Sequence, residues 1–325
     1  MDKWAQGSQR FGHRGYGRAG PLSRVLRAGV VSAGVFGGYH AHKYVSLADV
    51  ELAAVFDPDM DRARALAAEL GARAVDDLDA LLAMSDVVSV ASPATLHAEQ
   101  ALKALKAGRA VYVEKPLATS LEDADRMIAA ARGGPVLACG HLERVMFAAM
   151  GLLAIPEPPA AMFAVRKGPW SPRNADVSTV LDLMIHDIDL ALALNPAEPL
   201  AVEAEGRTTI GPFLDEVTAD VTLSDGSTVI LEASRIAEVR ERRMRLVYAS
   251  GEVEIDFLTG AFRNTTDYAL DPGFAEAPAG KDRLGASLQA FLDAVRGDAD
   301  RPAVTGEEAA RALDLALAVE QAAGG

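Results

Sequence analysis

The sequence predicts an α/β protein. An N-terminal Rossmann-type, doubly wound parallel sheet is followed by an α+β domain with an open, mostly antiparallel sheet. Three observations lead to this prediction. Short apolar strands alternate with helix-length segments, a glycine-rich turn follows the first strand, and strands succeed one another without intervening helices after about residue 145. Alternating strands and helices imply right-handed crossovers and a parallel sheet. A length of 325 residues suggests about two domains.

The first domain is predicted over residues 26–145. Glycine stop signals at Gly71 and Gly108 and a capping serine at Ser120 mark helix ends. Strands are expected at 26–33, 50–57, 86–92, 109–116 and 135–141. A helix-length stretch follows the first strand, and further helices are expected at 61–70, 78–85, 95–107 and 120–132.

The second domain is predicted over residues 146–325. Asp225-Gly226 lies between two alternating strands within 216–236, which is a strong hairpin signal, and Gly251 marks a second turn within 242–258. A further strand is expected at 160–168 and a helix at 180–194. Helices at 287–297 and 306–323 are expected to pack at the domain junction.

Composition excludes several classes of protein. The chain has 32 basic and 46 acidic side chains, a net charge of −14, and this acidic excess argues against nucleic acid as a partner. Residues 1–25 are rich in glycine and arginine and are predicted to be a disordered basic extension; a nucleic-acid or membrane arm is the alternative. The single cysteine, Cys139, indicates a reducing compartment, and no metal site is predicted. No apolar run reaches membrane-span length, so a cytoplasmic protein is expected.

The turn after the first strand predicts a dinucleotide site. It reads Ser32-Ala33-Gly34-Val35-Phe36-Gly37, a degenerate fingerprint with serine in the first glycine position. Gly34 lets the backbone approach a pyrophosphate, and Gly37 lets helix and strand pack closely. Asp57 ends the second strand, where it can bind ribose hydroxyls and repel a 2′-phosphate, and the following Pro58-Asp59 supplies no basic group. NAD is therefore predicted rather than NADP; the alternative is a glycine turn without a nucleotide.

Two further motifs carry candidate chemistry. Glu114-Lys115-Pro116 ends a predicted strand, at the sheet edge where open α/β sheets bind ligands, so Lys115 can donate to a substrate hydroxyl. Asp182 and His186 are four residues apart on a predicted helix, so the carboxylate can orient the imidazole as a base. The alternatives are a surface lysine and a structural Asp–His pair.

Together with SPATLH (92–97), GH (140–141) and a nearby His40, these motifs resemble the Gfo/Idh/MocA oxidoreductases over about residues 26–325. The resemblance implies that Lys115 binds the reacting hydroxyl, His186 is the acid/base, and Asp182 assists. It also implies that Pro93 and His97 line the nicotinamide side and that Glu114 supports its turn. The cofactor-binding set expected is Ser32, Gly34, Val35, Phe36, Gly37, Asp57, Ser92, Pro93, His97, Glu114 and Lys115.

A narrower resemblance links 140–150, 171–192 and 232–246 to the branch of UDP-N-acetylglucosamine 3-dehydrogenases. It implies oxidation of the sugar C3 hydroxyl, a ketone product passed to an aminotransferase for lipid A synthesis, and a homodimer or homotetramer. Guanidinium groups suit phosphate oxygens, so a diphosphate-bearing substrate is expected to contact His141, Arg144, Arg173 and Arg235, besides Lys115, Asp182 and His186. Arginines also alternate along a predicted strand, either as a solvated face or as ligand contacts: Arg240, Arg242, Arg243 and Arg245.

The function predicted from the sequence is therefore NAD-dependent oxidation of a secondary sugar hydroxyl, most concretely C3 of UDP-N-acetylglucosamine. The alternative enzyme is a dehydrogenase or reductase of a free sugar, an inositol or another nucleotide sugar. The alternative of a different class is a noncatalytic NAD- or sugar-binding regulator, which has no need to keep Lys115, Asp182 and His186 together.

Overall fold

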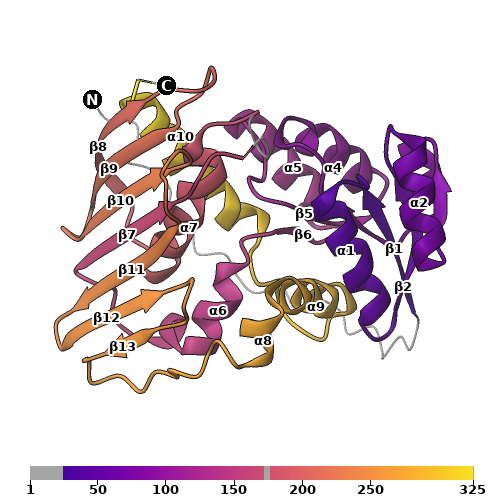
Figure 1. Cartoon of the computed structure of the whole chain (residues 1–325). Helices are drawn as coiled ribbons and strands as arrows, with labels where there is room; N and C mark the ends of the chain where they lie inside the picture. The colour runs from indigo at the N-terminus through magenta and orange to yellow at the C-terminus, as the bar shows by residue number, and fades with distance from the viewer. Residues whose placement is uncertain (1–24, 172–175, 325) are drawn as a thin grey trace.

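The computed structural model describes residues 25–171 and 176–324 and contains two sheets with helices between and around them. In Figure 1 the N-terminal sheet, drawn in indigo and purple, lies on the right, and the C-terminal sheet forms the left flank. Helices α6, α7, α9 and α10 lie in the space between the two sheets, so residues from both can meet there.

The first sheet has six strands in the order β3-β2-β1-β4-β5-β6, and every neighbouring pair is parallel. This is the doubly wound arrangement in which ligands bind beyond the carboxyl ends of the strands. Its strands are β1 (Leu26–Val31), β2 (Val50–Phe56), β3 (Arg73–Val75), β4 (Val87–Val90), β5 (Ala110–Val113) and β6 (Leu137–Cys139). Its helices are α1 (Val35–Ser46), α2 (Met60–Leu70), α3 (Leu78–Met84), α4 (His97–Lys106), preceded by η1 (Ala94–Leu96), and α5 (Leu121–Ala131).

The second sheet has seven strands in the order β13-β12-β11-β7-β10-β9-β8. All its pairs are antiparallel except β7 with β10. Its strands are β7 (Ala161–Lys167), β8 (Pro199–Arg207), β9 (Glu216–Leu223), β10 (Thr228–Ser234), β11 (Glu241–Tyr248), β12 (Gly251–Asp256) and β13 (Phe262–Asn264).

The helices between the sheets join the two units into one core. One buried cluster runs from one face of the first sheet through α6 to the inner face of the second sheet. The other face of the first sheet packs on α1 and α9, where the rings of Tyr112 and Phe291 meet edge to face at 5.7 Å. These linking helices are α6 (Glu143–Met150), η2 (Leu152–Ala154), a π-helical turn η3 (Val180–Met184), α7 (Ile185–Leu194), α8 (Pro278–Lys281), α9 (Arg283–Arg296) and α10 (Gly306–Ala322).

The structure confirms the predicted fold class, including the hairpin at Asp225-Gly226, where Gly226 has a φ of 86°. Three strands were not predicted: β3, β8 and β13. The expected helix at 180–194 begins instead with the π-helical turn η3, which changes the direction of its side chains. The predicted basic extension at 1–25 falls, apart from its last residue, outside the described residues.

No helix in the described part of the chain is long and apolar enough to cross a membrane. Within the same ranges, no group of three or more His, Cys, Asp or Glu side chains could hold a metal ion. Cys139 is buried at the end of β6.

Candidate active site

The turn from β1 to α1 brings the backbone of the first helical turn close to the backbone at the end of the strand. Ser32 has a φ of 88°, the left-handed conformation that the usual glycine supplies, and its Oγ accepts a hydrogen bond from the Gly34 amide at 3.2 Å. A Cβ on Gly37 would lie 1.8 Å from the carbonyl oxygen of Ser32. Only glycine therefore fits at position 37, which is the close helix–strand approach that a dinucleotide turn requires.

The same turn leaves the first amides of α1 without a side-chain acceptor. Gly34 is the N-cap, no side chain caps it, and the first turn contains no acidic residue, whereas side chains cap α2, α3 and α5. Unpaired amides and the positive end of a helix suit a pyrophosphate. A Cβ on Gly34 would touch only the Ser32 hydroxyl, so the approach to this turn is open. The residues therefore fit NAD.

Asp57 lies at the end of β2 and is buried. Its carboxylate accepts hydrogen bonds from the Ala33 amide at 2.7 Å, the Asp59 amide at 2.9 Å and the Arg62 guanidinium at 3.0 Å. A carboxylate offers about four acceptor positions, so one remains for a ribose hydroxyl. Arg62, which the sequence analysis did not identify, places a basic group beside this position.

His97 ties two loops of the first sheet together. Its Nε2 lies 2.9 Å from the Ser92 carbonyl and its Nδ1 lies 2.8 Å from the Pro116 carbonyl, next to the cis Lys115–Pro116 peptide. His97 and Ser92 line a small cavity of about 40 Å³ together with Phe36 and Lys115, whereas Pro93 does not line it. Both ring nitrogens of His97 are occupied by backbone, so the ring acts by holding the Lys115 loop.

Glu114 is buried beneath the same loop. Its Oε1 accepts a hydrogen bond from His40 Nε2 at 2.8 Å, and His40 Nδ1 lies 2.9 Å from the Ser89 hydroxyl, which also contacts Tyr44. Burial raises the pKa of Glu114, but the hydrogen bond and charge of His40 outweigh it and leave that pKa below its ordinary value. The ionised Glu114 thus anchors the strand end from which Lys115 extends.

Lys115 is held by Asp182 across the two units. Its Nζ donates to Asp182 Oδ1 at 2.8 Å and to the Asp182 carbonyl at 2.6 Å, and both side chains are largely buried. An ammonium group has three N–H donors, so one remains for a substrate oxygen. The expectation that Asp182 would orient His186 from one helix face is wrong, because Asp182 lies in the π-helical turn and contacts Lys115 instead.

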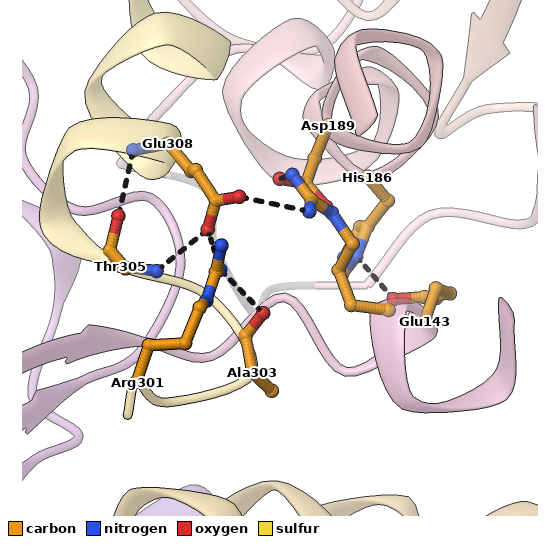
Figure 2. Close-up of polar contacts among 8 residues, drawn as sticks. Glu143, His186, Asp189, Arg301, Ala303, Thr305 and Glu308 are labelled. Carbon is orange, nitrogen blue, oxygen red and sulfur yellow. Dashed lines mark hydrogen bonds and ion pairs between the residues drawn. The ribbon is translucent and has the colours of Figure 1, made fainter. Parts of the chain in front are cut away.

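His186 is held by Glu143, the first residue of α6. The His186 Nδ1 lies 2.8 Å from Glu143 Oε2, a contact visible in Figure 2. Glu143 also accepts a hydrogen bond from Arg166 at 3.0 Å, and Arg166 forks onto Asp187. Burial raises the pKa of Glu143, but the charges of His186 and Arg166 outweigh it and hold that pKa well below the usual range. An ionised carboxylate can only accept, so His186 Nδ1 donates to it, and Nε2 is the ring nitrogen that can exchange a proton with a substrate.

Lys115, Asp182 and His186 line one cavity of about 370 Å³. The structure therefore brings the three predicted catalytic residues together, with Glu143 added. Glu143 was not predicted from the sequence, although it lies two residues after His141 and shortly after the end of β6, at the sheet edge where ligands bind.

The residues expected to hold a diphosphate are separated by the structure. Arg235 lines the cavity, where Asp215 accepts its Nε–H at 2.7 Å and its guanidinium lies over the Trp170 ring. Arg144 does not line that cavity: it forks onto Asp189 at 2.8 and 2.9 Å and also contacts Glu308.

Arg144 is buried with Asp189, and Figure 2 shows Glu308 bridging from this pair to Thr305 and Arg301 at the start of α10. Its place is therefore in the packing between α6, α7 and α10. Arg173 lies outside the described residues.

His141 is buried with its ring edge-on to that of His186, at a centroid distance of 6.2 Å. Neither ring nitrogen has a hydrogen-bond partner in the described structure. Burial lowers the pKa of His141 to about 4, so the ring is neutral near pH 7. It does not line the cavity, and its contact is with the base rather than with open space.

A Rossmann turn that fits NAD, next to a lysine and a histidine in one cavity, defines an NAD-dependent oxidoreductase acting on CH–OH groups. Family comparisons agree: an oxidoreductase family with an NAD-binding Rossmann fold matches residues 26–140, and a GFO/IDH/MocA C-terminal domain matches residues 157–254. The chain belongs to the GFO/IDH/MocA oxidoreductase family, which confirms the resemblance inferred from the motifs.

Individual relatives cover nearly the whole chain. The UDP-N-acetylglucosamine 3-dehydrogenase of Acidithiobacillus ferrooxidans is 37% identical over 91% of this chain and 97% of its own. Its solved structure superposes with a TM-score of 0.84. The WlbA dehydrogenase of Bordetella pertussis, solved with NADH and UDP-GlcNAcA, shares the fold with a TM-score of 0.82 at 21% identity, over 93% of this chain and 96% of that one. A myo-inositol 2-dehydrogenase of Thermotoga maritima is 28% identical over 91% of this chain and 96% of its own.

Proposed function

We propose that the protein oxidises the C3 hydroxyl of UDP-N-acetylglucosamine to a ketone, with NAD as the oxidant. The observation that supports this reaction is the pairing of Lys115 with Asp182 and of His186 with Glu143 around one cavity. The substrate is taken from the relative that is 37% identical over nearly the full length of both chains.

We propose a role for each of these side chains. The third N–H of Lys115 binds the substrate hydroxyl and favours its oxygen as it becomes negative. Nε2 of His186 removes the hydroxyl proton, and the carboxylate of Glu143, at Nδ1, stabilises the imidazolium that results. Bound NAD supplies the acceptor for the hydride that leaves the same carbon. Asp182 holds the Lys115 ammonium in place at the cavity wall.

The direct test is NADH absorbance when the protein meets UDP-N-acetylglucosamine and NAD. The ketone equilibrium alone is expected to be unfavourable, so a second arm adds an aminotransferase and an amino donor to consume the product. An absence of NADH in both arms would count against this substrate. A panel containing myo-inositol and N-acetylglucosamine tests the alternative of an unphosphorylated substrate. That alternative is favoured by an inositol 2-dehydrogenase of Saccharopolyspora erythraea, 38% identical over 37% of this chain and 37% of its own.

We also propose a pathway partner, a cellular location and an oligomeric state for the protein. A 3-keto sugar is a substrate for a pyridoxal-phosphate aminotransferase, so such an enzyme is the proposed pathway partner. A reducing, cytoplasmic location is supported by the single buried cysteine. A homodimer or homotetramer is also proposed, and light scattering of the purified protein tests it.

A further inference from the structure

Three arginines line the cavity that also holds Lys115 and His186. Arg240 precedes β11, Arg242 lies on β11, and Arg283 is the first residue of α9. Arg242 and Arg283 are half-buried and Arg240 is exposed at the rim.

None of these three guanidinium groups makes a hydrogen bond or ion pair with any residue that the structure describes. The carboxylates that line the same cavity are already engaged: Glu143 by Arg166 and His186, and Asp182 by Lys115. The charge of Glu143 reaches Arg242 and Arg283, but no carboxylate in the described part of the chain forms an ion pair with them or with Arg240.

Arg242 and Arg283 are partly desolvated and lie close to other positive charges. Burial lowers the pKa of Arg242. The positive charges of Arg166, Arg240 and Arg283 lower it further, and the charge of Glu143 opposes them. Burial likewise lowers the pKa of Arg283; the charge of Glu143 opposes this and the charge of Arg166 adds to it. Partly buried cations are normally paired, so a cluster without acidic partners favours an anionic ligand.

The other face of β11 provides an internal comparison. Arg243 and Arg245 alternate with Arg242 along the strand and point outward. There Arg243 lies 3.6 Å from Asp256, and Arg245 lies 3.2 Å from Glu252. On β11 the two outward arginines therefore have acidic partners, whereas Arg242, on the cavity side, has none in the described part of the chain.

We propose that Arg240, Arg242 and Arg283 bind the diphosphate of a nucleoside diphosphate sugar and so select that class of substrate over free sugars and inositols. This inference rests on the proposed function and names the site that recognises its substrate. Guanidinium groups bind phosphate oxygens through paired N–H donors, and three of them match a group that carries a negative charge on each phosphate. Arg144 was expected from the sequence to bind the diphosphate, but its guanidinium is held by Asp189. The three arginines are proposed for that role instead.

The position of the cluster also gives the substrate a direction. Arg242 belongs to the second sheet, whereas α9, which carries Arg283, packs on the first unit and is fixed by the ion pair of Asp282 with Lys43 at 2.8 Å. A diphosphate held there contacts both units, and the sugar that it carries extends along the same cavity toward Lys115 and His186.

The test compares Arg242→Gln and Arg283→Gln with the outward-facing control Arg243→Gln. The KM for UDP-N-acetylglucosamine is expected to rise about tenfold to hundredfold in each cavity variant, with kcat changed far less, because each loses a charged hydrogen bond to the diphosphate. Calorimetric binding of UDP should weaken by a similar factor, and Arg243→Gln should match the wild type in both assays. Thermal stability of the ligand-free cavity variants should not fall, since each substitution removes a partly buried charge that makes no ion pair.

The two readouts separate this inference from the proposed function. Binding of UDP that depends on Arg242 and Arg283, without oxidation of UDP-N-acetylglucosamine, would support the diphosphate site and overturn the proposed substrate. Oxidation with an unchanged KM in both cavity variants would overturn the diphosphate site alone. Failure of the wild-type protein to bind UDP would also overturn the diphosphate site.

Discussion

Replacing Glu143 with glutamine tests how the base is held. The Glu143 side chain is 8% exposed, and its oxygens receive hydrogen bonds from His186 at 2.8 Å and from Arg166 at 3.0 Å. Glutamine has the same shape, but Arg166 and His186 donate to different oxygens of Glu143, so the NH₂ of glutamine would face one of the two donors. The variant therefore loses a charged hydrogen bond and the negative charge that offsets the imidazolium.

The expected decrease in kcat follows from these contacts. A hydrogen bond to a charged group contributes about 1.5–3 kcal/mol, and each ~1.4 kcal/mol of barrier is a factor of ten in rate. Because the imidazolium forms only as the proton is removed, the loss should appear in kcat, as a decrease of about 10- to 100-fold. The KM for NAD should stay unchanged, because the turn between β1 and α1 does not contact Glu143.

Initial rates of NADH formation measure this effect, with Glu69→Gln as a matched control. Glu69 also contacts a histidine, His42 at 3.4 Å, but that pair is exposed, so its loss should leave kcat unchanged. Circular dichroism should show that Glu143→Gln is folded. A folded Glu143→Gln with wild-type kcat would refute the assignment of His186 orientation to Glu143.

Three further changes test other parts of the account. Gly37→Ala should weaken NAD binding measured by calorimetry, because its Cβ would meet backbone at 1.8 Å, whereas Gly38→Ala, which has open space, should bind normally. Arg144→Met should lower the free energy of unfolding by about 3–5 kcal/mol in urea titrations, since it leaves a buried carboxylate unpaired, while the exposed Arg126→Met changes it by less than about 1 kcal/mol. His141 has a folded pKa of about 4. Its unfolded form binds a proton near pH 6.5, so stability should fall by roughly 3 kcal/mol as the pH drops from 6.5 to 4, and His141→Leu should remove that part of the dependence.

Each of these three predictions would be contradicted by a specific result. Equal NAD affinity in the two glycine variants would remove the argument for close packing at Gly37. A raised substrate KM in a fully stable Arg144→Met protein would return Arg144 to the substrate site. An identical pH dependence of stability in His141→Leu and wild type would show that His141 is not buried as a neutral ring.

Local patterns in the sequence were sufficient for most of the fold. The first sheet follows from apolar strands bounded by glycine turns, and Asp225-Gly226 set the register of β9 and β10. The strands that were missed lack such a pattern: β8 lies at a sheet edge with mostly exposed residues, and β3 and β13 have three residues each. Edge strands are half-solvated, so their sequences carry little alternation.

The site residues at the ends of the strands were predictable from the sequence, but the residues that contact them were not. Lys115 and the Gly34–Gly37 turn are fixed by their position after parallel strands. The partner of His186 was assigned wrongly because spacing of four residues presumes an α-helix, and the chain forms a π-helical turn there. Glu143 and Arg283 reach the cavity through tertiary packing, which spacing along the chain does not reveal.

The central claim is that Lys115 and His186 together remove hydrogen from a substrate hydroxyl. Its most direct test is the rate of NADH formation from NAD and UDP-N-acetylglucosamine by the wild type and Lys115→Met, with product removed by an aminotransferase. The account predicts that the wild type forms NADH, whereas Lys115→Met loses at least about a hundredfold in rate and keeps its affinity for NAD. A Lys115→Met protein that turns over at the wild-type rate would contradict it.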